Sequence, residues 1–365
     1  MKDIKQDPFD EYIKNLPPTK QELGYAWSTA IGLQDVDDLK PSEYLYETAK
    51  KSINGDISID QAGELIDSYY ENKSDRLESE ARTEEADKVS ARIAKLLSDK
   101  SFTFSPAQYV AIHKELFKGI YSHAGKLRSY NISKKEWVLD GNSVQYGGAL
   151  DLRETLEYDF SVERNFSFNG LTMDETIHHL ALFVSRLWQI HVFGEGNTRT
   201  TAVFFIKYLR MLGFDVDNDL FADNSWYFRN ALVRANYNNI RKGVYETTEF
   251  IEKFLKNLLL GDTNELQNRE MHIKAISVLE ECNYTSDSIN DLINDPTNDP
   301  IKLSERERTI VNLLRKEPTL TRVEMAEKIG CSDSTVKRTL QAMTQNDIIK
   351  RVGSNKKGQW VILIK

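Results

Sequence analysis

The segment HVFGEGNTR, residues 191–199, places a base, a metal ligand and an anion ligand within nine residues. His191 is a candidate general base for a hydroxyl, because imidazole accepts protons near neutral pH. Glu195 offers hard carboxylate oxygens, which suit Mg²⁺ that carries phosphates. Arg199 offers a planar fork of N–H donors for phosphate oxygens. Together these residue types predict a site for phosphoryl-type transfer.

The other residues of the segment favour the same chemistry. Gly196 lets the backbone approach an anion closely, and the N–H groups of Asn197 and Thr198 come where the next helix begins. Phe193 is the predicted hydrophobic anchor of the loop. A single histidine at a helix end is more often a cap or a core residue, but the residues that follow His191 favour catalysis.

Two apolar helices must hold this loop. Residues 172–190 are predicted as a long buried helix, and the helix resumes from Arg199 to Leu212. Trp137–Tyr146 is an extended run around Asp140-Gly141, which is typical of a β-hairpin. Further helices are predicted from Pro41 to Asn54, from Ser58 to Glu71, from Glu84, from Ser105-Pro106, over Trp226–Tyr237 and over Thr247–Leu259.

The segment 191–199 is similar to the Fic signature, His-x-Phe-x-(Asp/Glu)-Gly-Asn-x-Arg followed by two residues and a second Arg. Ala124-Gly125-Lys126-Leu127-Arg128 followed by Asn131 also resembles that family, over roughly residues 85–260. The resemblance implies a mainly α, all-helical Fic fold with a small β-hairpin flap. The implied flap residues, which align the target segment, are Trp137, Val138, Leu139 and Tyr146.

The resemblance also implies an activity, namely transfer of AMP from ATP to a Tyr, Thr or Ser hydroxyl of a protein target. His191 then takes the hydroxyl proton and Glu195 holds Mg²⁺. The implied nucleotide-binding residues are Gly196, Asn197, Thr198 and Arg199. The sequence departs from the signature at Ala202, which stands where the family has its second Arg. A nucleotide-sensing transcriptional regulator with a weak or inactive Fic domain is the alternative.

Residues 20–75 resemble the antitoxin partners of Fic toxins. In those partners a Glu blocks ATP by pairing with the second Arg of the Fic loop, and here Asp37 stands at the Glu position. Because the acid is shortened and its arginine is replaced by Ala202, we expect both halves of the inhibitory ion pair to be lost. The expected restraint is therefore weak or works otherwise.

The C-terminal segment is basic, although the chain as a whole carries −8. From Leu303 to Lys365 there are 13 Lys and Arg against 7 Asp and Glu, so this segment carries +6 and the rest −14. Three short helices and two alternating strands predict a winged helix-turn-helix that binds DNA or docks a protein. The predicted DNA contacts are Ser334, Lys337, Arg338, Lys356 and Lys357.

The predicted domains are an antitoxin-like segment (1–80), a Fic domain (81–262), a helix and linker (263–302) and the winged helix (303–365). The two cysteines, Cys282 and Cys331, predict neither a disulfide framework nor a zinc site. No apolar run is long enough to span a membrane, and the polar start is no signal peptide. The cytoplasm is the predicted compartment, and the oligomeric state is open, a homodimer included.

Overall fold

The computed structural model describes residues 8–71, 78–216, 219–274, 305–329, 331–345, 349–352 and 359–362. The chain divides into two compact units, residues 1–293 and 294–365. The larger unit is helical wherever it has regular structure in its described part, and it contains the loop 191–199. Its α-helices are α1 (Pro8–Lys14), α2 (Pro18–Gly32), α3 (Glu43–Asn54), α4 (Ile59–Glu71), α5 (Glu78–Ser98), α6 (Pro106–Phe117), α7 (Leu152–Arg164), α8 (Met173–Ile190), α9 (Asn197–Met211), α10 (Leu220–Asp223), α11 (Ser225–Arg234) and α12 (Glu249–Leu260). Its 3-10 helices are η1 (Leu33–Asp37), η2 (Trp137–Leu139), η3 (Ile240–Lys242) and η4 (Asn268–Met271).

Helices α3 and α6 begin within two residues of their predicted starts, each with a side-chain cap, whereas the helix predicted from Glu84 begins at Glu78. The Ser42 and Ser105 hydroxyls accept from the backbone N–H groups of Leu45 and Gln108, three residues on. Gly55 ends α3 in the left-handed region at φ 84°. Such caps satisfy backbone groups that a helix end leaves without partners.

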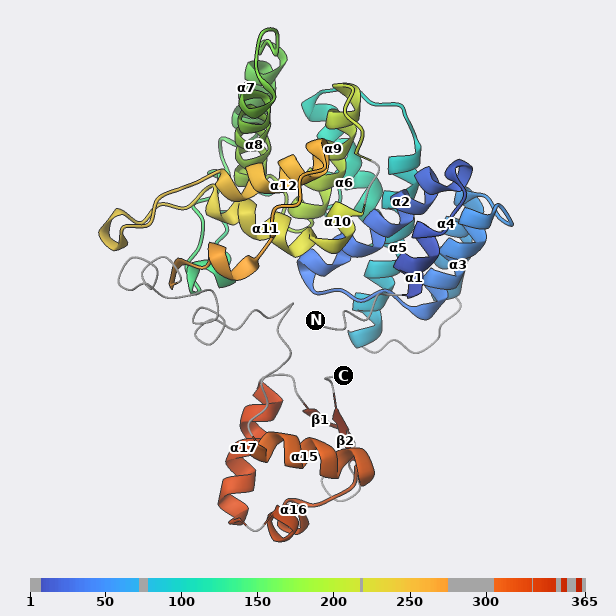
Figure 1. Cartoon of the computed structure of the whole chain (residues 1–365), viewed down its shortest axis with the longest axis vertical. Coiled ribbons are helices and arrows are strands. Elements are labelled where there is room, and N and C mark those ends of the chain that lie inside the picture. The colour runs from blue at the N-terminus through green and yellow to red at the C-terminus, as the bar shows by residue number, and fades with distance from the viewer. Residues whose placement is uncertain are drawn as a thin grey trace. The chain divides into compact units, whose positions relative to one another are not determined.

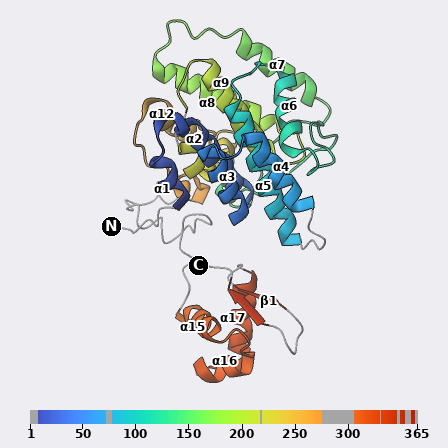
Figure 2. The same cartoon turned by 90° about the vertical axis from the view of Figure 1, so that its right-hand side faces the viewer.

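The N-terminal helices share one hydrophobic core with the helices that carry the loop. Trp27 and Ala30 of α2 are fully buried, and they belong to the same cluster as Phe193 and Phe204. Helix α2 packs along α5 (Figures 1 and 2), and α5 in turn packs on α9. Gly32 is required at the end of α2, because a Cβ there would lie 2.4 Å from the carbonyl oxygen of Ala222. Residues 18–37 are thus an integral part of the core around the loop.

Helices α8 and α9 pack on each other, and the loop is the break between them. Thr172 and Glu175 form a capping box that starts α8. His191 ends α8 in the left-handed region (φ 52°, ψ 55°), and Gly196 starts α9 from the same region (φ 74°, ψ 11°). Helix α7, for which we predicted no element, packs on α8 (Figure 1).

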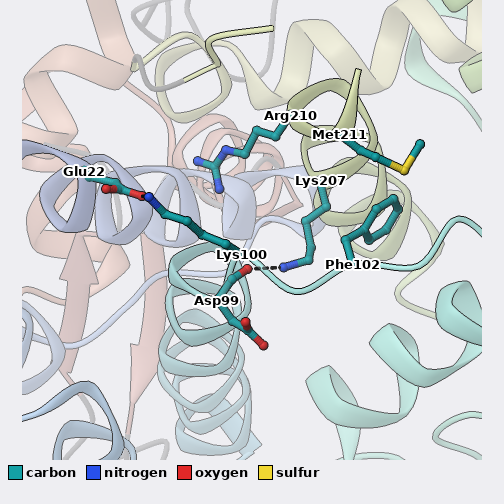
Figure 3. A pocket seen from close by; sticks show the side chains of 7 residues that line it. All are labelled: Glu22, Asp99, Lys100, Phe102, Lys207, Arg210 and Met211. Carbon is teal, nitrogen blue, oxygen red and sulfur yellow. Dashed lines mark hydrogen bonds and ion pairs between the residues drawn. The ribbon is translucent and has the colours of Figure 1, made fainter. Parts of the chain in front are cut away.

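Two cations near the end of α9 cap the end of α5. The Lys207 ammonium donates to the carbonyl oxygens of Leu96 (2.7 Å) and Asp99 (2.5 Å), and Arg210 donates to that of Leu97 (2.6 Å). Figure 3 shows them beside a cavity of about 340 Å³. Cations are favoured at a helix C-terminus, so these contacts fix α9 against α5.

The predicted β-hairpin at Trp137–Tyr146 is wrong in one respect. The chain does turn at Asp140-Gly141, where both residues have positive φ, and the Glu136 N–H donates to the carbonyl of Asn142. However, Trp137–Leu139 is a 3-10 helix, and no strand is assigned between the described residues 131 and 146. Strand pairing is absent because the turn directs Val138 and Leu139 into the core, where both are fully buried.

The smaller unit has the predicted helix, turn, helix and two-stranded sheet. Its elements are α15 (Glu305–Lys316), α16 (Arg322–Ile329), α17 (Asp333–Gln345), β1 (Ile349–Val352) and β2 (Gln359–Ile362). The strands are antiparallel, with Ile349 opposite Ile362. The apolar faces of the three helices and the sheet form a separate core around Leu314, Met325 and Val336.

Several predictions concern residues outside the described ones: the helix and linker 263–302 from residue 275 onward, Cys282, Lys356 and Lys357. Among the described helices, none combines the length and apolarity needed to cross a bilayer.

A buried histidine supports the loop from α6. His113 is fully buried, and its ring stacks on Phe193 at 3.7 Å between centroids. Its Nδ1 accepts from the Gly125 N–H at 2.9 Å, so Nε2 carries the proton and donates to the Glu195 carbonyl at 3.0 Å. Burial lowers the pKa of His113 to about 4, which keeps the ring neutral.

We predict that acid destabilises the fold through His113. Between pH 6.5 and 4 the His113 side chain is protonated in the unfolded chain but not in the folded chain. The free energy of unfolding therefore has its full value above pH 6.5 and decreases as the pH falls. The loss amounts to about 2 kcal/mol at pH 5. Urea unfolding of His113→Gln, followed by tryptophan fluorescence at pH 7 and pH 5, should show a pH-dependent loss smaller by that amount.

The matched control is His178→Gln, whose side chain is 55% exposed. Equal acid losses in wild type and His113→Gln would contradict the prediction.

Candidate functional site

His191 has the geometry of a general base. It is 3% exposed. Its Nδ1 donates to the Trp188 carbonyl at 3.3 Å, which leaves Nε2 as the acceptor, and Nε2 has no partner in the described structure. Burial, followed by the charge of Lys134, holds the pKa of His191 well below its ordinary value. The ring is therefore neutral at pH 7, with a lone pair free to take a proton.

The loop after His191 is fixed from inside. The Asn197 side chain accepts from the Phe193 N–H (3.0 Å) and donates to the Phe193 carbonyl (2.8 Å). Phe193, the predicted anchor of the loop, is fully buried. At Gly196 a Cβ would lie 2.3 Å from the Phe117 ring, so only glycine fits there.

The N-terminus of α9 offers backbone donors to an anion. Gly196 is its N-cap, and no side chain caps the helix. The Thr198 hydroxyl accepts from Trp188 Nε1 at 3.0 Å, so this side chain is bound to α8. The side chains of Asn197 and Thr198 are thus bound within the protein. The groups that could donate to an anion here are the backbone N–H groups of residues 196–198.

Glu195 is the one acidic residue of the loop 191–199, and its side chain is 54% exposed. Its Oε2 lies 2.9 Å from the ammonium of Lys134, a residue that we did not predict. No cluster of three or more metal-binding side chains occurs among the described residues. A single accessible carboxylate nonetheless fits Mg²⁺, because this ion is commonly held by one or two carboxylates together with substrate phosphates and water.

Arg199 is buried, 1% exposed, and its guanidinium is bound by other parts of the protein. Nε lies 2.8 Å from Asp37 Oδ2, an ion pair without hydrogen-bond geometry. Nη2 donates to Glu85 Oε1 at 2.6 Å and Nη1 to Gln34 Oε1 at 3.1 Å. The guanidinium also lies over the Phe117 ring, 4.8 Å from its centroid.

These contacts correct the expectation that the Asp37 ion pair is lost. Ala202 does stand at the position of the second signature Arg, and it is fully buried. Asp37 instead pairs with Arg199, one helical turn earlier. Sequence comparison missed this pairing because residues three apart on a helix share a face, so a neighbouring arginine meets the same carboxylate.

The predicted flap residues lie in different surroundings, and most of them do not contact the site. Trp137 packs edge-on against His272, with ring centroids 5.0 Å apart, and Val138 and Leu139 are buried. Only Tyr146 reaches the site: its ring centroid is 4.3 Å from that of His191. The Tyr146 hydroxyl donates at 3.0 Å to Glu136, a buried acid that the sequence analysis missed.

Two arginines, the buried Arg128 and the partly exposed Arg229, hold the flap, and neither was predicted as a site residue. Arg229 pairs with Glu136 at 2.7 Å. Arg128 donates to the carbonyl oxygens of His191 (2.7 Å), Tyr130 (2.6 Å) and Gly147 (2.5 Å). Arg128 thus joins both ends of the flap to the base of the loop. The resemblance around residues 124–131 was the one feature of the sequence that pointed to Arg128.

The smaller unit presents a basic groove. Lys337 and Arg338 are exposed on α17, while the side chain of Ser334 lies outside the described part. An open cavity of about 670 Å³ lies among the start of α16, α17 and the strands. Its polar lining, which includes the predicted Lys337, consists of Thr321, Arg322, Lys337, Gln341, Thr344, Arg351 and Trp360.

Comparisons with known proteins agree with this arrangement. Residues 103–209 match the Fic/DOC family, and residues 303–350 match the winged helix-turn-helix DNA-binding family. No curated protein matches the chain. One similar solved structure is the N-terminal FIC domain of Bep8, a VirB-translocated effector from Bartonella sp. 1-1C. It is 18% identical with a TM-score of 0.39, over 51% of this chain and 88% of that one.

Another is a Fic family protein from Desulfovibrio desulfuricans G20, which is 11% identical with a TM-score of 0.42, over 96% of this chain and 89% of that one. The Fic/DOC match includes α6, α8, the loop 191–199 and most of α9, and the second match covers the three helices of the smaller unit. The chain thus contains a Fic/DOC family domain, matched over residues 103–209, and a C-terminal winged helix-turn-helix domain, matched over residues 303–350.

Proposed function

We propose that this protein transfers AMP from ATP to a hydroxyl of a protein target. Fic proteins are generally nucleotidyl transferases, which sets the class of reaction. The observation that supports the proposal most is the state of His191, a neutral ring with Nε2 free beside the N-terminus of α9. A domain that only senses a nucleotide needs no such base.

The proposed reaction is a displacement at the α-phosphorus of ATP. The target hydroxyl oxygen forms the new P–O bond, and its proton passes to Nε2 of His191. The bond from the α-phosphorus to the bridging oxygen breaks, so pyrophosphate leaves. The backbone N–H groups at the start of α9 stabilise the negative charge on the phosphate oxygens.

Mg²⁺, held by Glu195 and the phosphates, would neutralise charge on the transferred group when bound. The protein's own contribution is positional. Arg128 and the Asn197 side chain hold the loop, and Tyr146 lies against the His191 ring. A base that is held in place loses little entropy on reaching the transition state.

We further propose that the N-terminal segment restrains nucleotide binding through Arg199. Asp37 and Glu85 pair with the Arg199 guanidinium, which would otherwise bind the phosphates of a nucleotide. Phosphate can bind there only after a carboxylate has left. Asp37 is the one to leave, because it belongs to the short η1 helix and its side chain is 33% exposed, against 16% for Glu85.

For the smaller unit we propose DNA binding, with the alternative that the whole chain is a nucleotide-sensing regulator. The basic groove supports it, since Arg322, Lys337 and Arg351 come together from three elements. Arginine and lysine in such a groove neutralise phosphates and release counterions. A protein-docking role remains the competing function of this unit.

The first prediction of this proposal concerns His191. With ATP and Mg²⁺, wild type should gain the mass of AMP on itself or on a target, and His191→Ala should lose at least about 100-fold in rate. Intact mass spectrometry and radiolabel from ATP measure both. His178→Ala, in the same helix, is the control. Equal labelling in His191→Ala and wild type would rule out this base.

The second prediction concerns Asp37. Asp37→Asn should raise kcat/KM for ATP about tenfold, because it removes one carboxylate that competes with phosphate for Arg199. Asp38→Asn is the matched control: it makes the same charge change at the adjacent, exposed residue. A substitution is preferable to deleting residues 1–80, which would remove Trp27 from the core.

If Asp37→Asn lowers the melting temperature while kcat/KM stays equal to that of Asp38→Asn, the ion pair is structural and the restraint is refuted.

The third prediction concerns DNA. Fluorescence anisotropy with a random duplex should show binding that weakens steeply with salt, and Lys337→Ala should reduce the slope of log K against log salt by about 1. Lys328→Ala is the control, because Lys328 pairs with Glu317 on another face at 2.8 Å. Absence of binding at low salt would favour protein docking.

A further inference from the structure

Lys134 lies in the flap segment, which we define as residues 131–146, and its ammonium faces the loop 191–199. Its ammonium lies 2.9 Å from Glu195 Oε2, and its side chain is 29% exposed. The Lys134 N–H donates to Ser143 Oγ at 3.1 Å, which ties this part of the flap to its returning half. The contact with Glu195 joins residues 61 positions apart in the sequence. The ammonium is thus placed at the loop by the fold and is still accessible to a ligand.

Lys134 also acts on the base. After burial, its charge is the largest cause of the lowered pKa of His191. One positive charge therefore lies close enough to affect His191 while it contacts Glu195. The attacked phosphate must lie between these two residues, because one takes the proton and the other holds the metal. A phosphate there would lie within reach of Lys134.

The other cations near His191 are bound by the protein. Arg128 is bound to backbone carbonyls and Arg229 is paired with the buried Glu136. Arg199 is bound by Asp37 and Glu85. Position 202 holds an alanine. A polyphosphate that enters this site would thus meet backbone N–H groups but few side-chain cations in the described structure.

We propose that Lys134 is a phosphate-binding residue of this site, contributed by the flap. It would bind the polyphosphate of a nucleoside triphosphate in place of the cation missing at Ala202. The ammonium exchanges the Glu195 carboxylate for phosphate oxygens, and this exchange frees Glu195 for Mg²⁺. The inference rests on the proposed function for the identity of the ligand, but it concerns binding and not transfer.

The adjacent lysine is a built-in control. Lys135 is exposed, while Lys134 is half-buried against the loop. Both carry the same charge on the same segment, so any long-range effect of charge is common to both. Of these two lysines, only Lys134 contacts Glu195 in the described structure.

The test is calorimetric titration of the full chain with ATP and with adenosine, each with and without Mg²⁺. Lys134→Gln should weaken ATP binding about 10- to 100-fold, the loss expected for a hydrogen bond to a charged group. Adenosine binding should stay unchanged, because adenosine has no phosphate. Lys134→Arg should retain most of the ATP affinity, and Lys135→Gln all of it.

The outcomes separate this inference from the proposed function. Equal ATP affinity in Lys134→Gln and Lys135→Gln overturns it, as does a wild type that binds no ATP at millimolar concentration. Equal loss of ATP and adenosine binding also overturns it, because that pattern marks a structural role. If the ATP-specific loss occurs but wild type transfers no AMP, Lys134 is a phosphate ligand and the proposed transferase activity fails.

Discussion

The structure around the loop depends on the burial of one charge, the guanidinium of Arg199. A cation that is 1% exposed is stable only when it is paired and hydrogen-bonded, because desolvation otherwise costs several kcal/mol. Asp37, Gln34 and Glu85 supply that pairing from η1 and α5. The site therefore holds two carboxylates for one guanidinium. If Asp37 leaves, Glu85 still neutralises Arg199, so opening the site does not strand a buried charge.

In contrast to the buried Arg199, the two buried histidines at the loop are uncharged. Burial lowers the pKa of both His113 and His191, so both rings are uncharged at neutral pH. His191 is also held at a positive φ, which costs about 1–2 kcal/mol in a non-glycine residue. Hydrogen bonds from Arg128 to its carbonyl and from its Nδ1 to Trp188 hold this conformation. The strain fixes the direction of Nε2, as a base requires.

The features that could be predicted from the sequence are those that depend on residues close together in the chain, namely helices, turns and the segment 191–199. Helices α8 and α9 are predicted by their apolar residues, α8 also by its capping box, and the segment 191–199 is contiguous, so the helices and the segment could be read directly. The turn at Asp140-Gly141 was predicted for the same reason. The strands that were predicted on either side of this turn are absent from the described structure. Strand pairing depends on whether Val138 and Leu139 pack in a sheet or in the core, and the local sequence does not decide this. Helix α7 has a stripe of buried Leu152, Leu156 and Phe160 that could have revealed it.

The supporting residues of the site could not be predicted, since nothing local marks them. Glu85 meets Arg199 across 114 residues, His113 meets Glu195 across 82, and Lys134 meets Glu195 across 61. Glutamate and lysine at such positions look like ordinary helix or loop charges. The pairing of Asp37 was mispredicted for a related reason: the signature gives positions along a helix, whereas an ion pair depends on which cation on that face is present.

Ala202 explains why these contacts come together on one residue. A second arginine one turn after Arg199 would share Asp37 and Glu85, and each guanidinium would keep donors for phosphate. With alanine there, Arg199 receives both carboxylates, and its donors are used by the protein. Relative to the signature, the alanine thus leaves Asp37 to Arg199 and leaves the proposed nucleotide site with one positive charge fewer. In the proposed function, restraint and phosphate recognition are therefore coupled through one position, because the charge that is missing at Ala202 must come from another element.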